Sequence, residues 1–430
     1  MSKEKGQAAS GEEGEEGPAT ARQQLQQRRR QAQPQPQPQR PRRGRTGDVA
    51  NLPLGSLINR RWHLLRKLGE GGCGAVYAAT DTHGADALPQ SVGCTMSEWS
   101  SAAATAGDTV ETATAEPTAD TAATATDDAA APTEVPAVGV SQQKKRPPQM
   151  YAIKFEARQR GKETVLKMEY DILRRLNEAG APAWRRRHCC QLYDFGKTSS
   201  YSFIVMTLVG PSLSELRRRQ PSGRLSLSST LLVAAQALAA LRNLHLVGFV
   251  HRDLKPSNLA VGRGAHERRV YLIDFGLARR HLERSSAAGG EERVRRPRRS
   301  VGFRGTACYC SPTLHAKEEQ SRRDDLWSLV FTLIELHRGL PWADFRHKKD
   351  VVLAKTSMPD WQLCERMPSG FVEMLAHIRA LAYDQRPDYN RLYRIIRQMM
   401  VRHNVRKEDP FDWEKPTGRL RSHASPVNAD

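Results

Sequence analysis

The sequence predicts an α+β fold with two lobes, a small strand-rich lobe first and a larger helical lobe after it. Short runs of alternating apolar and polar residues gather before about residue 210. Longer stretches with apolar residues at helical spacing dominate the rest of the chain. Strands that precede helices, rather than alternating with them, are typical of the α+β class.

The first lobe is expected to hold several strands and one helix. The run 62–80 alternates on both sides of a glycine cluster, and MYAIKFEA, residues 150–157, forms a further strand. A helix is predicted over 163–180, and Gly180 stands where it would end. Its apolar positions recur at helical spacing, at Val165, Met168, Ile172 and Leu176. A strand pair follows over 190–197 and 201–210.

The second lobe is expected to be mostly helical. Its four longest helical patterns cover 230–248, 323–339, 371–383 and 389–403.

The composition divides the chain into four parts. Residues 1–58 are expected to form a disordered arm rich in Gln, Pro and Arg, because this stretch lacks the apolar residues of a core. Residues 62–402 hold the globular domain, and residues 403–430 form a C-terminal tail. Within the domain, 83–148 reads as a low-complexity insertion of Ala, Thr and acidic residues, a kind of loop that costs little closure entropy.

The composition also indicates an intracellular, cytoplasmic protein, and its basic runs leave the nucleus open. No apolar run reaches the roughly 18–20 residues of a membrane span, and the polar start does not resemble a secretory signal. The seven cysteines lack paired CxxC motifs and fit reduced thiols. The net charge of +20 favours acidic partners. Without interleaved aromatic residues or a base-reading motif, nucleic acid is not expected as the main ligand.

A glycine cluster in the first lobe could bind phosphates through its backbone. Gly69, Gly71 and Gly74 allow backbone amides to approach phosphate oxygens closely. Dinucleotide-binding loops share this spacing but lead into a helix, whereas VYAAT here reads as a returning strand. An ordinary glycine-rich turn remains an alternative for this cluster alone.

The strand after the insertion carries Lys154, which could reach phosphates if a carboxylate fixed its direction. Glu169 on the following helix is the candidate partner. Taken alone, a solvated surface pair explains these two residues equally well.

The most specific signal is the run His251–Asn258, HRDLKPSN. Phosphoryl transfer needs a carboxylate to orient the attacking hydroxyl and an oxygen ligand for magnesium, and Asp253 and Asn258 supply both from one loop. Lys255 could neutralise charge on the transferred group. Asp274 opens a DFG sequence 16 residues after Asn258 and offers a second hard oxygen ligand.

With these motifs in this order, the sequence resembles the eukaryotic protein kinases and implies their bilobal fold. It resembles most closely the tau-tubulin kinase family of the casein kinase 1 group, over about Trp62 to Trp413 outside the insertion. The motifs that carry this closer resemblance are VLKMEYDIL, LVGPSL, HRDLKPSN, GFRGT, RRDDLWSL, GLPW, RPDY and FDWEK.

The resemblance implies an ATP- and Mg²⁺-dependent serine/threonine protein kinase. Its substrates would be proteins, with tubulin, microtubule-associated and acidic proteins suggested as partners. Asp253 would be the catalytic base, assisted by Lys255, with Asn258 and Asp274 as magnesium ligands. Asp325 would brace the catalytic loop. The ATP-binding residues would be Leu68, Gly69, Gly71, Gly74, Val76, Ala152, Lys154, Glu169, Met206 and Val209.

The sequence departs from this family at three places: Cys73, Cys308 and the insertion 83–148, which precedes the strand of Lys154. Cys73 stands at the tip of the glycine loop, where relatives often place an aromatic residue. Cys308 stands where relatives typically carry an arginine that binds phosphorylated or acidic substrates, so a preference for such substrates is not assured. The usual Ala-Pro-Glu that ends the activation segment is replaced by the run 310–313, CSPT, a departure similar to that of the casein kinase 1 group.

Two functions other than an active enzyme fit parts of the sequence. A pseudokinase scaffold would act through the basic arm and the insertion, and it predicts a broken lysine, base or magnesium ligand, which the sequence does not show. A basic protein that binds microtubules or nucleic acid predicts salt-sensitive binding by residues 1–60 alone.

Overall fold

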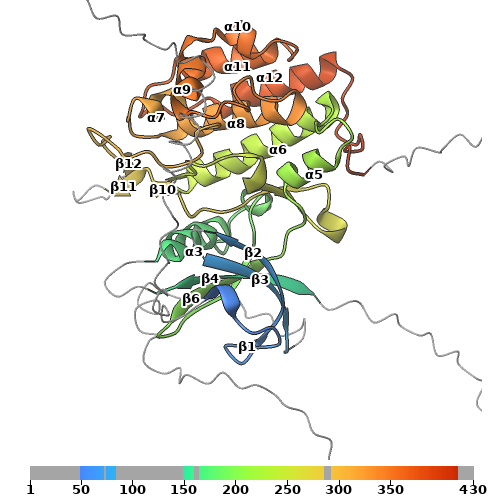
Figure 1. The fold of residues 1–430 in the computed structure, drawn as a ribbon, viewed down its shortest axis with the longest axis vertical. Helices are drawn as coiled ribbons and strands as arrows, with labels where there is room; N and C mark the ends of the chain where they lie inside the picture. The colour runs from blue at the N-terminus through green and yellow to red at the C-terminus, as the bar shows by residue number, and fades with distance from the viewer. Residues whose placement is uncertain (1–48, 72–73, 84–148, 159–163, 285–291, 415–430) are drawn as a thin grey trace, which may run out of the picture. The chain divides into compact units, whose positions relative to one another are not determined.

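The described chain forms a sheet lobe followed by a helical lobe (Figure 1). The structure is a computed structural model that describes residues 49–71, 74–83, 149–158, 164–284 and 292–414. The predicted α+β, two-lobed arrangement is confirmed. The predictions for Cys73, for nearly all of the N-terminal arm and the insertion, and for the end of the tail lie outside these residues.

The sheet lobe is built on six antiparallel strands in the order β1-β2-β3-β4-β6-β5. Both strands around the glycine cluster and the strand after the insertion form as predicted, and β4 has the predicted bounds. The strands are β1 (Leu57–Ile58), β2 (Trp62–Gly71), β3 (Gly74–Asp81), β4 (Met150–Ala157), β5 (Leu192–Lys197) and β6 (Tyr201–Thr207).

Alternation along β4 gives the sheet two different faces. Tyr151, Ile153 and Phe155 point into the apolar core of the lobe, where the Tyr151 and Phe155 rings make edge-on contacts with neighbouring aromatic rings. Ala152 and Lys154 lie on the opposite face, since successive side chains of a strand alternate. Alternating side chains of β4 therefore face the apolar core on one side of the sheet and a ligand-accessible surface on the other.

The described residues begin at Val49, which lies inside the range 1–58 predicted for the N-terminal arm. Val49 is buried in the core of the sheet lobe, within the short helix η1 (Val49–Asn51). The hydroxyl of Tyr77 donates to the carbonyl of Ala50 at 2.8 Å. Contacts with both β3 and β4 hold this short helix against the sheet.

The helix α3 (Val165–Leu176) forms within the predicted range, but its buried face is rotated from the expected one. Ile172 and Leu176 are buried as predicted, whereas Val165 is exposed. Glu169 belongs to the buried face because its carboxylate meets a lysine from the sheet. The spacing of apolar residues in a sequence cannot predict that a charged residue lies on the packing face of a helix.

The helical lobe packs around the long apolar helix α6 (Leu227–Leu246), against α8 (Arg322–His337) and α12 (Tyr389–Arg402). All four predicted helices form, the fourth being α11 (Gly370–Arg379). Among the described helices, α6 alone is long and apolar enough to cross a membrane, and its packing inside the lobe explains that composition.

Shorter elements complete the helical lobe and the segments that join it to the sheet lobe. The short helices are α4 (Ala183–Arg186), α5 (Leu213–Arg219), η2 (Pro256–Asn258), η3 (Gly264–His266), α7 (Pro312–His315), α9 (Lys348–Ser357) and α10 (Asp360–Leu363). The paired short strands are β7 (Phe249–Val250) with β10 (Arg279–Arg280), β8 (Leu259–Val261) with β9 (Val270–Leu272), and β11 (Leu282–Arg284) with β12 (Glu292–Val294).

The first part of the predicted C-terminal tail is packed into the helical lobe. Phe411 is only 1% exposed, and the guanidinium of Arg268 lies 5.2 Å from its ring centre. The carboxylate of Asp412 accepts the backbone N–H of Ser226 at 2.6 Å, next to the start of α6. The globular domain therefore extends at least to this segment.

Replacing Phe411 with alanine should lower the free energy of unfolding by about 3–5 kcal/mol, because it removes a fully buried aromatic ring. Chemical denaturation of the full chain would measure the change. Trp361→Ala, at a ring that is 68% exposed, is the matched control and should change stability little. Equal losses in both variants would contradict the packing of this segment.

Candidate active site

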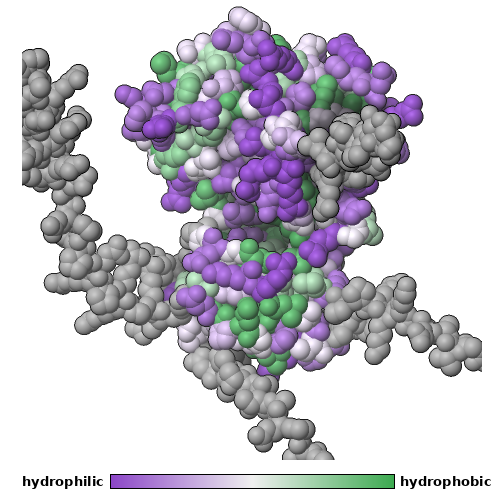
Figure 2. Space-filling view, turned by 45° about the vertical axis from the view of Figure 1, so that its right-hand side comes forward, coloured by the Kyte–Doolittle hydropathy of each residue, from purple (hydrophilic) through white to green (hydrophobic). Residues whose placement is uncertain are grey.

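A cleft of about 1100 Å³ gathers twelve of the fourteen residues singled out from the sequence. All ten residues expected to bind ATP line it, and so do Asn258 and Asp274. Asp253 and Lys255 are not part of its lining but contact each other directly beside Asn258. On the face drawn in Figure 2, hydrophilic residues cover much of the helical lobe.

The sheet supplies one wall of this cleft. Val76 on β3 and Ala152 on β4 lie on the sheet face that turns away from the aromatic core, and both pack in a small apolar cluster with Leu208. Met206 at the end of β6 packs against the same cluster. A flat apolar wall of this kind suits a planar ring system.

Gly74 is required by the backbone of the glycine loop. Its φ of 120° lies in the region that residues with a side chain rarely adopt. A Cβ atom here would lie 1.8 Å from the carbonyl oxygen of Phe155 on β4. A Cβ atom added at Gly69 or Gly71 would have no neighbour within 4 Å. The backbone of the sheet therefore requires glycine only at Gly74, the third glycine of the motif.

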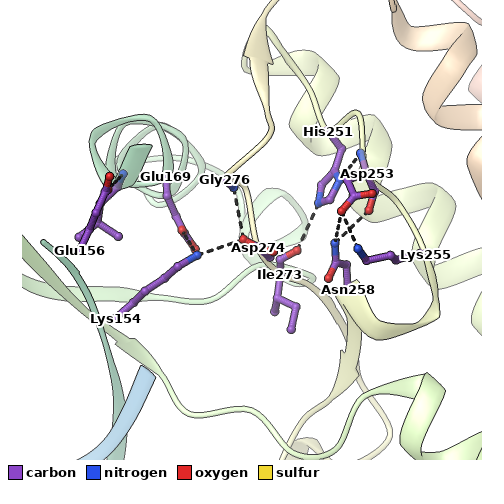
Figure 3. Close-up of polar contacts among 11 residues, drawn as sticks. Lys154, Glu156, Glu169, His251, Asp253, Lys255, Asn258, Ile273, Asp274 and Gly276 are labelled. Atoms are coloured by element: carbon purple, nitrogen blue, oxygen red, sulfur yellow. Dashed lines mark hydrogen bonds and ion pairs between the residues drawn. The ribbon is translucent and has the colours of Figure 1, made fainter. Parts of the chain in front are cut away.

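Lys154 is held between two carboxylates, one from each side (Figure 3). Its Nζ donates to Glu169 Oε2 at 2.6 Å and to Asp274 Oδ1 at 3.0 Å. Burial alone would lower the pKa of Lys154, but the two carboxylates outweigh it and raise the pKa, so the ammonium stays charged. The predicted Lys154–Glu169 pair is thus a buried pair and not a surface one.

Asp325 on α8 fixes the backbone of the loop that carries Asp253. Its carboxylate accepts the N–H groups of His251 at 2.7 Å and of Arg252 at 2.8 Å. The ring of His245 lies 2.8 Å from the same carboxylate. Burial would raise the pKa of Asp325, but these hydrogen bonds lower it, so the carboxylate stays ionised. The predicted brace is present in the structure.

The loop holds Asp253 within a small hydrogen-bonded network. Lys255 Nζ donates to Asp253 Oδ2 at 2.7 Å, and Thr306 Oγ1 donates to Asp253 Oδ1 at 2.8 Å. The amide nitrogen of Asn258 donates to the Asp253 carbonyl at 2.9 Å, which leaves the amide oxygen available (Figure 3). His251 links this loop to the neighbouring segment through the Ile273 carbonyl, 3.2 Å from its Nε2.

Sequence reasoning missed Thr306, which bridges Asp253 and Lys255 from a segment about 50 residues away. The run GFRGT was noted only as a family motif, and nothing local in it indicates a contact with the loop. Four arginines that line the cleft were also missed: Arg66, Arg218, Arg219 and Arg263.

The segment without Ala-Pro-Glu is anchored by hydroxyl groups. Ser311 and Thr313 both donate short hydrogen bonds to Asp324 at the start of α8. Cys308 stands close by, half-buried, and its carbonyl accepts from the Trp342 indole at 3.0 Å. Burial raises the pKa of the Cys308 thiol, so this side chain stays uncharged.

The protein kinase domain model matches residues 138–396, which is more than half of the chain. The chain belongs to the protein kinase family. The two lobes described above are therefore those of the bilobal kinase fold. The glycine loop precedes the matched segment but lies in the same sheet as β4, so the kinase domain extends beyond the match.

Named relatives place this kinase among the serine/threonine kinases. A probable serine/threonine-protein kinase of Dictyostelium discoideum is 38% identical over 60% of this chain and 50% of its own length. A Caenorhabditis elegans protein, also named a serine/threonine-protein kinase, is 29% identical over 86% of both chains. An inactive tau-tubulin kinase of the same worm is 33% identical over 57% of this chain and 86% of its own length. The chain spans half the length of the Dictyostelium relative.

Gly74→Ala should destabilise the kinase even without nucleotide, by about 1–3 kcal/mol, because the new Cβ meets the β4 backbone at a strained φ. Thermal unfolding of the nucleotide-free protein measures this effect. Gly71→Ala is the matched control, since open space surrounds its Cβ position. Equal stability of both variants would show that the loop accommodates a side chain at Gly74.

Proposed function

We propose that this chain is an active, ATP- and Mg²⁺-dependent serine/threonine protein kinase of the casein kinase 1 / tau-tubulin kinase type. One observation carries the proposal: the buried Lys154–Glu169 pair contacts Asp274, and Asn258, which donates to the Asp253 carbonyl, accepts the N–H of Ile273 next to Asp274.

The residues beside Asp274 fit a magnesium ion. The amide oxygen of Asn258 and the cleft-facing carboxylate of Asp274 are hard oxygen donors, which Mg²⁺ prefers. Among the described residues, no cluster of three or more His, Cys, Asp or Glu side chains could hold a metal alone. Phosphate oxygens would therefore complete the coordination, as is usual for Mg²⁺ in phosphoryl transfer. When bound, the ion would neutralise charge on the phosphates.

Each side chain then has a task that its contacts support. Lys154, fixed by Glu169, would hold the phosphates of ATP, which is a substrate of the reaction. Asp253 would accept a hydrogen bond from the serine or threonine hydroxyl and take its proton. Lys255, now paired with Asp253, would stabilise negative charge on the transferred phosphoryl group. Thr306 would position both of these side chains.

Acidic protein segments are the substrate class that the charges favour. Arg66, Arg219 and Arg263 line the cleft and form no ion pair with a carboxylate among the described residues. The resemblance to tau-tubulin kinases suggests tubulin and microtubule-associated proteins, whose acidic segments such arginines could attract. A cytoplasmic location, with access to the nucleus, accords with such partners.

An inactive scaffold is the second candidate, because one relative is named an inactive kinase. It predicts nucleotide binding without phosphoryl transfer. The intact contacts of Lys154, Asp253 and Asp274 favour the active enzyme.

Incubation with Mg²⁺, labelled ATP, casein and tubulin should give label on serine or threonine. Asp253→Asn should reduce the rate by at least about 100-fold, because it removes the proton acceptor. Chelation of Mg²⁺ should abolish labelling. Quantitative phosphoamino-acid analysis gives the readout, and the preferred protein indicates the substrate class.

ATP binding, followed as a thermal shift, serves as the control in these assays. It should persist in Asp253→Asn, which keeps the shape of the side chain. If the wild-type protein binds ATP but labels the substrates no more than the background, the active-enzyme proposal is overturned and the scaffold is favoured.

A further inference from the structure

A second groove, here called the hinge groove, shares only Thr207 and Leu208 with the nucleotide cleft. Its volume is about 670 Å³. Its other walls come from the segment around α4 and from the turn between β8 and β9. The side chains that matter most for its chemistry are Trp184, Arg186, Arg187, Tyr193, Arg269 and Tyr271.

The hinge groove carries positive charge without a balancing carboxylate. Arg186, Arg187, His266 and Arg269 line it, and no Asp or Glu does. None of the three arginines forms an ion pair with a carboxylate among the described residues. The guanidinium of Arg269 has one weak contact, 3.5 Å to the hydroxyl of Tyr271. Like charges gathered in one concave site attract anions strongly.

Backbone contacts hold the two walls in place. The Asn243 amide donates to the carbonyl of Trp184 at 3.0 Å, and Leu272 N–H donates to the His188 carbonyl at 3.0 Å. On the other wall, Gly262 N–H donates to the Arg269 carbonyl at 2.8 Å, and a Cβ at Gly262 would lie 2.1 Å from a backbone oxygen. The groove is therefore formed before any partner arrives, which lowers the entropy cost of binding.

We propose that the hinge groove is the docking site of the acidic insertion of the same chain, within residues 84–143. Two observations choose this occupant. Gln149, the first described residue after the insertion, is itself part of the groove lining. Residues 84–143 hold nine Asp and Glu residues and no Lys or Arg, so their charge complements that of the groove.

The chain length allows this contact. Glu134, the acidic residue of the insertion nearest to Gln149, precedes it by 15 residues, which span at most about 50 Å when extended. Tethering keeps the local concentration of the acidic segment high, so modest contacts suffice. Arginine pairs bidentately with carboxylates, and the tyrosine and tryptophan rings offer apolar surface to the Ala and Thr side chains between them.

A competition experiment on full-length chains tests the docking. The probe is a fluorescein-labelled peptide of residues 107–135, which carries seven of the nine carboxylates. In a variant called charge-neutral after residues 84–143, all nine Asp and Glu of that segment become Asn and Gln, so the groove is vacated, while Lys144, Lys145 and Arg146 stay unchanged. We expect this variant to bind the peptide in fluorescence anisotropy at least about tenfold more tightly than wild type, and more weakly as salt is raised.

Adding Arg186→Glu, Arg187→Glu and Arg269→Glu to the charge-neutral variant should weaken peptide binding at least about tenfold. The matched control reverses Arg397, Arg402 and Arg406, three exposed arginines of the helical lobe with no ion pair to a described carboxylate, and should leave binding unchanged. If the triple reversal lowers the melting temperature, the milder Arg→Gln triple variant replaces it.

Two results would overturn the proposal. Equal binding of the peptide by wild-type and charge-neutral chains would mean that the insertion does not occupy the groove, which would then serve an acidic segment of another protein. Equal losses from groove and control reversals would mean that net charge, and not this groove, attracts the peptide. Both outcomes are independent of whether the kinase transfers phosphate.

Discussion

The buried ammonium group of Lys154 is the constraint on which the rest of the active site depends. An unpaired charge at such a site would cost several kcal/mol, so its partners must be in place. Glu169 comes from α3 and Asp274 from the segment after β9, whereas Lys154 comes from the sheet. One charge therefore ties three separate elements together, and the position of α3 against the sheet follows from it.

A second buried charge organises the helical side of the cleft. Asp325 holds two consecutive backbone N–H groups, which allows Arg252 to adopt a φ of 68°. Asp274 also has a positive φ, of 62°. Such conformations cost about 1–3 kcal/mol each and persist only where the surroundings over-determine them. Two of these conformations lie in the loops that present Asp253 and Asp274, where the position of a carboxylate matters most.

The sequence predicted most of what depends on local pattern. The bounds of β4 and the presence of all four long helices were predicted. Alternation marks β4, whereas long apolar stretches mark helices such as α6 and α8, which are buried on most sides. The fourteen site residues were named from motifs and from the family resemblance that those motifs carry, and they come from several strands and loops of both lobes. The features that the sequence did not predict depend on contacts between distant parts of the chain. Val49 packs in the core of the sheet lobe, and Thr306 donates to Asp253. Glu169 lies on the buried face of α3, which is therefore rotated from the predicted face. No local signal records such contacts.

The large positive charge of the chain has several distinct causes. Arg61, Arg217 and Arg298 are neutralised by Asp81, Glu335 and Glu319 and belong to the scaffold. Other arginines face the nucleotide cleft or the hinge groove without such partners. A sequence does not show which arginines pair with carboxylates. The net charge of +20 therefore does not reveal which sites attract anions, whereas the structure does. Unpaired arginines in concave sites attract anionic groups most strongly, and here two such sites share the lining residues Thr207 and Leu208.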